Sequence, residues 1–143
     1  ALMTQLLDLS PDMHVLEVGT GSGYQAAVLG EIVDSVYTIE IVPELARSAA
    51  NVLDSLGYDN VVVRAGDGYA GWPEHQPFDA IVVTAAPEEV PPPLINQLAE
   101  GGQLVIPVGP TNWTQYLTLI EKRDGEIRRE RVLPVRFVPF TRN

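Results

Sequence analysis

A predicted strand followed directly by three closely spaced glycines constrains this chain more than any other feature of its sequence. The apolar run at residues 15–18 predicts a buried parallel strand, and Gly19, Gly21 and Gly23 follow it at alternate positions. A helical pattern then runs over residues 22–32. Because glycine has no side chain, such a loop lets the backbone approach a ligand closely at the start of a helix. The stretch therefore predicts a ligand-binding loop.

The spacing of these glycines separates two classes of ligand. The dinucleotide fingerprint is G-x-G-x-x-G, whereas this chain has G-x-G-x-G. The shorter pattern leaves no room for a pyrophosphate and favours a nucleoside such as S-adenosylmethionine over NAD. Glu17 lies within the end of the strand, where a carboxylate suits an amino or cationic group better than a phosphate. On this motif alone, a glycine-rich turn that binds nothing is the alternative.

Composition narrows the class of protein further. With 45% hydrophobic and 20% charged residues, the 143 residues are typical of a soluble globular chain, and we expect a single domain over residues 1–143. The net charge of −10 argues against a nucleic-acid partner. No apolar run is long enough to span a membrane. The lack of cysteine excludes thiolate metal sites and is compatible with the cytoplasm, where we expect a monomer without a metal ion.

The order of the predicted elements indicates the fold class. Strands are predicted at residues 14–18, 33–40, 60–64, 78–83 and 103–108, with helices at residues 22–32, from residue 43 to a stop at Gly57, and around residues 94–98. This alternation predicts an α/β, Rossmann-like fold with a doubly wound, mostly parallel sheet. Strands at residues 116–122 and 126–138 form a C-terminal antiparallel hairpin, and residues 101–102 a tight turn. Helical spacing before residue 10 indicates a chain that begins within a helix, which we interpret as an N-terminal truncation.

Polar groups recur at the carboxyl ends of the predicted strands, where open α/β sheets bind ligands. Glu40 comes 21 residues after Gly19 and can accept hydrogen bonds from both hydroxyls of a ribose. Asp67 is alone typical of a turn, but after the third strand we expect it to contact an adenine amino group. Further cofactor contacts are expected from residues next to these strand ends, namely Thr20, Ser22, Ile41, Gly68 and Thr84. His14 and His75 have no triad or metal partner in the sequence.

Several longer motifs resemble the protein-L-isoaspartate O-methyltransferases, a family within the class I S-adenosylmethionine-dependent methyltransferases. The matching stretches extend over essentially the whole chain and are residues 15–24, 57–61, 66–68, 77–87, 101–109 and 135–140. The last two stretches are specific to this family rather than general to methyltransferases.

The resemblance implies a repair reaction on damaged proteins and peptides. A methyl group passes from S-adenosylmethionine to the free carboxylate of an L-isoaspartyl residue, and S-adenosylhomocysteine is released. The resemblance implies cofactor contacts by Ser22, Glu40, Ile41, Asp67, Gly68 and Thr141. It also implies that the strand of Val135, Arg136, Phe137 and Val138 lies along the substrate peptide.

No catalytic side chain is identified in this sequence. A carboxylate is already ionised near pH 7, so the reaction needs no general base to form its nucleophile. In the family, an active-site serine lies in a Thr-Ile-Ser-x-Pro motif of an N-terminal segment, and nothing in residues 1–10 matches that motif. We therefore expect the cofactor half of the site to be complete and the half that holds the substrate carboxylate to be incomplete.

Two alternatives stay open. The chain could be a methyltransferase core that binds the cofactor but is inactive in this truncated form. It could also be a class I methyltransferase for a small-molecule carboxylate or amine, although residues 135–140 disfavour this because a small ligand needs no peptide-facing strand. A nicotinamide dehydrogenase is disfavoured by the glycine spacing and by the lack of a catalytic His or Tyr-x-x-x-Lys set.

Overall fold

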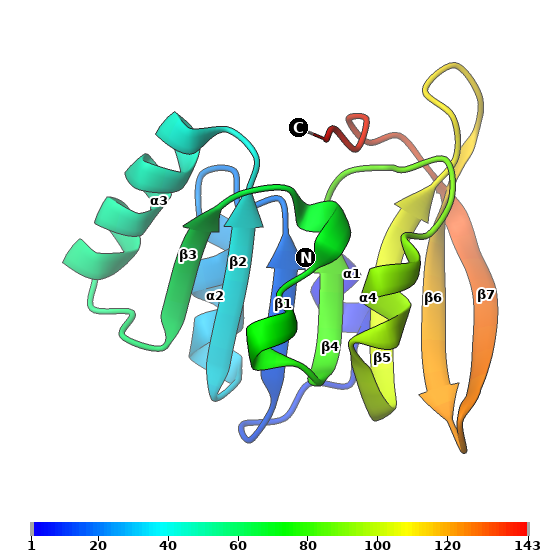
Figure 1. Ribbon diagram of the computed structural model, residues 1–143, viewed down its shortest axis with the longest axis horizontal. Coiled ribbons are helices and arrows are strands. Elements are labelled where there is room, and N and C mark those ends of the chain that lie inside the picture. The colour runs from blue at the N-terminus through cyan, green and yellow to red at the C-terminus, as the bar shows by residue number, and fades with distance from the viewer. Residues whose placement is uncertain (1, 143) are drawn as a thin grey trace.

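The computed structural model describes residues 2–142 and contains a seven-stranded sheet with the strand order β3-β2-β1-β4-β5-β6-β7 (Figure 1). The strands β1 to β5 pair in parallel, whereas β6 and β7 are antiparallel. The strands are β1 (His14–Val18), β2 (Ser35–Glu40), β3 (Val61–Ala65), β4 (Phe78–Val83), β5 (Leu98–Val108), β6 (Gln115–Arg123) and β7 (Glu126–Val135). This arrangement confirms the predicted α/β fold with a mostly parallel, doubly wound sheet and a C-terminal hairpin.

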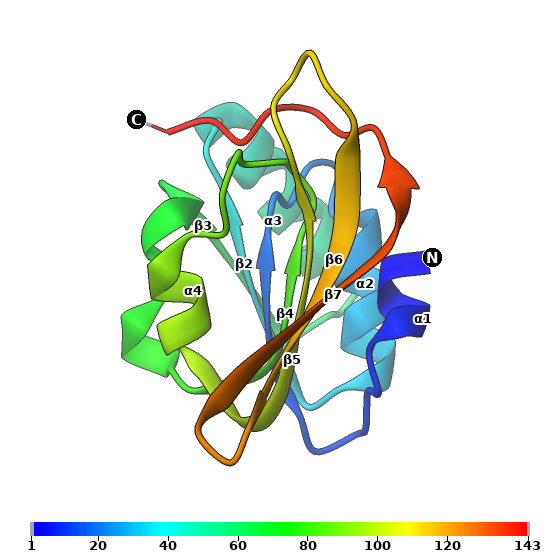
Figure 2. The same ribbon diagram turned by 90° about the vertical axis from the view of Figure 1, so that its right-hand side faces the viewer.

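Helices cover both faces of the sheet, as a largely parallel sheet requires. In Figure 2, α1 and α2 lie on one side of the sheet and α4 on the other. The helices are α1 (Leu2–Leu6), α2 (Tyr24–Ile32), α3 (Pro43–Ser55) and α4 (Pro92–Asn96), with short 3₁₀ turns η1 (Gly68–Ala70) and η2 (Pro73–His75). The start of α3 fits its sequence, because Pro43 occupies a first-turn position where its missing N–H costs nothing.

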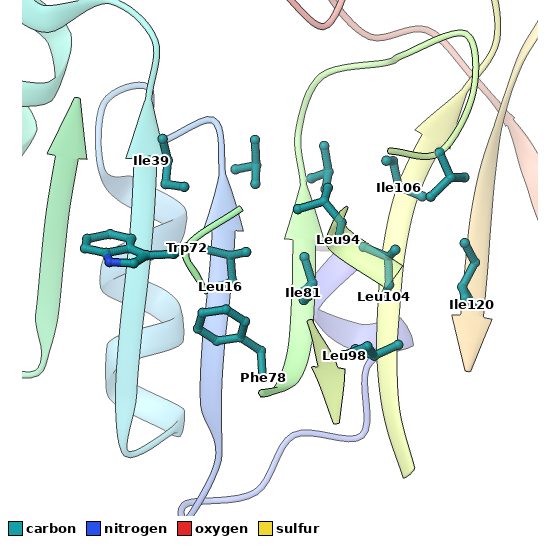
Figure 3. Packing of buried hydrophobic residues seen from close by; sticks show 13 residues of the cluster. Leu16, Ile39, Trp72, Phe78, Ile81, Leu94, Leu98, Leu104, Ile106 and Ile120 are labelled. Atoms are coloured by element: carbon teal, nitrogen blue, oxygen red, sulfur yellow. The ribbon is translucent and has the colours of Figure 1, made fainter. Parts of the chain in front are cut away.

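The core consists of two apolar layers, one on each face of the sheet. Successive side chains of β1 alternate between them, since Leu16 belongs to the layer beneath α4 while Val15 belongs to the layer beneath α1 and α2. Figure 3 shows Leu16, Ile81 and Leu104 side by side on neighbouring strands of the first layer, all fully buried. The two layers explain why the central strands are almost continuously apolar.

The predicted boundary between the helix around residues 94–98 and the strand at residues 103–108 is wrong, because α4 ends at Asn96 and Leu98 already belongs to β5. Residues 101–102 are not a tight turn but part of β5, where the register with β4 shifts between the pairs Phe78–Leu98 and Ala80–Gln103. The extra residues of β5 between these two pairs form an irregularity within the strand, and pairing with β4 continues on either side of it.

The last strand is also shorter than predicted. It ends at Val135, so Arg136, Phe137 and Val138 lie beyond it in a segment without regular secondary structure. The hairpin that precedes it is as predicted, since Asp124 (φ 54°) and Gly125 (φ 75°) are both left-handed, as a two-residue β-hairpin turn requires. In the described part of the chain, no helix is both long and apolar enough to cross a membrane.

Candidate functional site

A cavity of about 420 Å³ opens at the carboxyl ends of β1, β2 and β4, where the strand order reverses. Open α/β sheets bind ligands at such a reversal, and the volume suits a nucleoside-sized ligand. The C-terminal segment passes over this edge of the sheet and contributes Val138 to Thr141 to the lining (Figures 1 and 2). Most of the remaining lining is apolar and comes from Val18, Ile39, Ile41, Val42, Leu45 and Ala85.

The glycine loop at the end of β1 is fixed from below by Thr84. The Thr84 hydroxyl lies 2.9 Å from the Gly19 carbonyl oxygen and 3.1 Å from that of Val18. A Cβ at Gly19 would lie 2.1 Å from the Thr84 Oγ1, so only glycine permits this contact. At Gly21 (φ 54°), by contrast, a Cβ would meet no atom within 4 Å, and the residue lines the cavity. The loop thus presents bare backbone to a ligand at Gly21 and is positioned by Thr84.

Glu40 at the end of β2 is the one charged side chain among the described residues that line the cavity. The residue is 7% exposed, and its carboxylate accepts hydrogen bonds from the backbone N–H groups of Gly21 (2.8 Å) and Val42 (3.1 Å). The bonds to Gly21 and Val42 fix the carboxylate while leaving acceptor capacity for ligand hydroxyls. A wall with one carboxylate and no basic side chain suits a cationic nucleoside and not a phosphate-bearing one.

Glu17 lies beneath the glycine loop and not in the cavity lining, contrary to the expectation of direct contact with a ligand amino group. Its side chain is fully buried, and Thr38 donates a 2.6 Å hydrogen bond to its Oε1. The Thr38 hydroxyl is itself 2.6 Å from that of Thr20 in the loop. Burial raises the pKa of Glu17 to about 7, opposed by the Thr38 hydrogen bond and reinforced by the charge of Glu40.

The other expected cofactor residues divide into two groups. Ile41, Gly68 and Thr141 line the cavity, whereas Ser22 is exposed on the loop and stands outside the lining. Asp67 is also outside it, since its carboxylate caps η1 by accepting from the Tyr69 N–H (3.0 Å) and pairs with Arg142 (3.2 Å). Among the described residues, no three His, Asp or Glu side chains gather in a way that could hold a metal ion.

The segment after β7 is held in place by Gln115, a residue that sequence reasoning missed. The Gln115 amide, 2% exposed, accepts from the Phe137 N–H (2.6 Å) and donates to the Phe137 carbonyl (3.3 Å). On the other side, the Ala86 N–H donates to the Val138 carbonyl oxygen (2.8 Å). Arg136 and Val138 are exposed. No signal in the sequence distinguishes Gln115 from an ordinary polar residue at a strand start.

Sequence reasoning also missed the apolar walls of the cavity, although the positions of these residues beside the expected contacts could have indicated them. Val42, Leu45, Ala85, Pro139 and Phe140 line the cavity, and each lies near an expected contact. Apolar side chains that flank polar strand ends are therefore good candidates for the walls of a nucleoside site.

The chain matches, over residues 1–143, the model of the family described as Protein-L-isoaspartate(D-aspartate) O-methyltransferase (PCMT). It is 61% identical to the protein-L-isoaspartate O-methyltransferase of Opitutus terrae, a match that covers 99% of this chain and 61% of the relative. It is 56% identical to that of Gloeobacter violaceus, covering 99% of this chain and 69% of the relative. The chain thus spans about three fifths of the length of the first of these relatives.

Two solved structures that resemble this chain carry the same description. One described as protein-L-isoaspartate O-methyltransferase superposes with a TM-score of 0.90 at 34% identity, covering 96% of this chain and 45% of that one. A Plasmodium falciparum protein described as a protein-L-isoaspartate O-methyltransferase, in complex with S-adenosyl-L-homocysteine, superposes with a TM-score of 0.82 at 30% identity, covering 99% of this chain and 72% of that one.

Proposed function

This chain belongs to the protein-L-isoaspartate O-methyltransferase family, and we propose from that membership that it methylates the free carboxylate of L-isoaspartyl residues in damaged proteins and peptides. The methyl donor in this proposal is S-adenosylmethionine. The observation that carries the proposal is the cavity at the strand ends, where the glycine loop fixes Glu40 as the one charged group among the described lining residues.

The residues of the cavity fit this cofactor. Glu40 would accept hydrogen bonds from the ribose hydroxyls, and Ile41 and Leu45 offer apolar surface for the adenine. Gly21 leaves open the space that a Cβ would fill, so the amino-acid part can approach the backbone. The P. falciparum relative in complex with S-adenosyl-L-homocysteine supports this assignment.

The reaction asks for positioning rather than for a side-chain acid or base. S-adenosylmethionine supplies a methyl group on a sulfonium, so a carboxylate oxygen gains the bond to the methyl carbon as the carbon–sulfur bond breaks, and S-adenosylhomocysteine is left. An isoaspartyl carboxylate is ionised near pH 7, so no proton has to be removed. The chain contributes by holding the reactants in line and by excluding water, for which Phe140, packed against the core at the cavity, is well placed.

The substrate peptide would lie along Arg136–Val138, which Gln115 and Ala86 hold at the edge of the cavity. Recognition of an extended peptide through its backbone would accept many sequences, as a repair reaction requires. The proposal includes no metal ion and no nucleic-acid partner. The monomeric state and the cytoplasmic location remain predictions.

Two experiments on the full-length protein would test the proposal: calorimetric titration with S-adenosylhomocysteine, and an assay of methyl transfer to an isoaspartyl peptide. Glu40→Ala is expected to weaken binding by about 1–3 kcal/mol, or roughly 5- to 150-fold, because the ribose hydroxyls lose a charged acceptor. Glu126→Ala, an exposed acid in the β6–β7 hairpin, is the matched control.

Transfer to the isoaspartyl peptide, and none to the same peptide with ordinary aspartate, would support the whole proposal. Binding without transfer to the peptide would favour a cofactor-binding core instead. Unchanged affinity in Glu40→Ala would remove Glu40 from the cofactor site.

A further inference from the structure

A second hollow, of about 520 Å³, lies where the loop between β5 and β6 approaches the end of β7. In Figure 1 this loop projects at the upper right, close to the point where β7 leads into the C-terminal segment. Its lining consists of Thr111, Asn112, Trp113, Thr114, Val135 and Arg136. The proposed function gives the four loop residues no role.

Trp113 is held outward on this loop. The residue is 77% exposed, although Trp is normally well buried in folded proteins. The base of the loop is closed, since the Gly109 N–H donates to the Pro87 carbonyl (2.9 Å) and a Cβ at Gly109 would lie 2.8 Å from the Thr114 oxygen. The Trp113 N–H donates to the Pro110 carbonyl (3.2 Å) and so closes a turn at the tip. An exposed indole on a constrained loop is a typical anchor for a partner.

Arg136 brings a cation to the same hollow. It is exposed, and within the described residues its guanidinium has no carboxylate within 4.0 Å. Trp and Arg are the residues most enriched at energetic centres of interfaces, and here both line one hollow.

The hollow and the proposed active site are both lined by the segment after β7. Val138 lines the first cavity and Arg136 the second, so two residues of one segment connect them. Extended chain rises about 3.3 Å per residue, which separates the two positions by about 7 Å. A peptide that lies along this segment with its isoaspartyl residue at the first cavity would present a side chain about two positions away to the second.

We propose that Trp113 and Arg136 form a specificity subsite for the peptide residue about two positions from the isoaspartyl residue. The subsite takes an aromatic side chain, which stacks on the Trp113 indole, while Arg136 donates to a carbonyl or carboxylate oxygen of the same peptide. This inference rests on the proposed function for the identity of the reacting residue.

The test compares isoaspartyl peptides that carry Tyr or Gly two positions before or after the isoaspartyl residue. For the full-length protein we expect the Tyr peptide of one of these pairs to have a KM about tenfold lower than its Gly partner. Trp113→Ala should abolish this preference with kcat changed by less than about twofold, and Trp113→Phe should restore most of it. Leu56→Ala removes a similarly exposed apolar side chain (65%) from the end of α3 and should change nothing.

Binding of the same peptides, fluorescently labelled, in the presence of S-adenosylhomocysteine separates the two proposals. Methyl transfer with the same KM in wild type and Trp113→Ala would overturn the subsite and leave the repair reaction standing. Tyr-selective binding that depends on Trp113, without transfer to any peptide, would support the subsite and overturn the reaction. Equal binding of all peptides by both proteins would also overturn the subsite.

Discussion

At the scale of single residues, Glu17 shows how a ligand-binding loop can depend on a group that never reaches the ligand cavity. Its carboxyl lies beneath the loop, and the hydroxyls of Thr38 and Thr20 connect it to the loop residues. Its Oε2 has no hydrogen-bond partner within the described residues. A buried carboxylate with one unsatisfied oxygen favours the protonated form, which is why its pKa is raised.

The raised pKa of Glu17 predicts a stability that falls as the pH rises. Its pKa is about 7 in the folded chain against an ordinary value of 4.5, so between these pH values the folded state holds a proton that the unfolded state has lost. The free energy of unfolding should therefore fall by about 3 kcal/mol from below pH 4.5 to above pH 7 through this group. Glu17→Gln should remove that loss, which urea unfolding at pH 5 and pH 8 would measure.

The control for this prediction is Glu126→Gln, in which the altered carboxyl is exposed at the β6–β7 hairpin. Its unfolding free energy should follow that of the wild type at both pH values. If Glu17→Gln also followed the wild type, the carboxyl of Glu17 would have its ordinary pKa in the folded chain.

At the scale of elements, a side chain positions the segment after β7, where the backbone hydrogen bonds between β6 and β7 have ended. The strand ends at Val135, yet the amide of Gln115 pairs with both backbone groups of Phe137 as a neighbouring strand would. This pairing brings Val138 to the first cavity and Arg136 to the second. The buried amide of Gln115 thus fixes the proposed peptide-binding segment at Phe137, and the backbone of Ala86 fixes it at Val138.

Gln115→Ala should free this segment. Loss of the amide leaves the Phe137 N–H and carbonyl without their partners, at a cost of about 1–3 kcal/mol. Hydrogen exchange at the Phe137 amide should then accelerate by roughly 5- to 150-fold, which native-state exchange measured by NMR would detect. Gln103→Ala, which removes an amide on β5 bonded to Glu121 of β6, should leave Phe137 exchange unchanged. Unaltered exchange in Gln115→Ala would show that Ala86 alone holds the segment.

At the scale of the whole molecule, the first cavity exists only in the folded chain. Its walls come from the ends of β1, β2 and β4, from the start of α3 and from the C-terminal segment. A ligand that needs all of these parts binds the folded state and not the unfolded one. Ligand binding should therefore stabilise the molecule against heat.

S-adenosylhomocysteine at about 100 times its Kd should add about 2.7 kcal/mol to the free energy of unfolding. For a chain of this length we expect the Tm to rise by roughly 5–11 °C, as measured by differential scanning calorimetry. Gly21→Val should abolish the rise, because its side chain would enter the cavity. Gly101→Val is the matched control, since this glycine also has a positive φ (80°) and open space around it but lies outside the cavity. A full Tm rise in Gly21→Val would place the ligand elsewhere.

The sequence by itself determined the order of the elements and the edge of the sheet where ligands bind. Apolar periodicity and glycine positions report which face of an element is buried and where the chain must adopt a left-handed conformation, and both are local properties. Hence the parallel strands, the hairpin turn at Asp124 and Gly125, and the placing of Glu40 at the cavity followed from the sequence.

Tertiary structure alone decided how the side chains near that edge are used. It placed Glu17 under the loop, Ser22 outside the cavity lining and Asp67 on a helix cap. It also brought Trp113 and Arg136, more than twenty residues apart in the chain, to the lining of one hollow. These outcomes depend on distances between elements far apart in the sequence and on which partner satisfies each buried polar group. Neither quantity is a property of a local pattern, because both are fixed only when the sheet and its helices pack together.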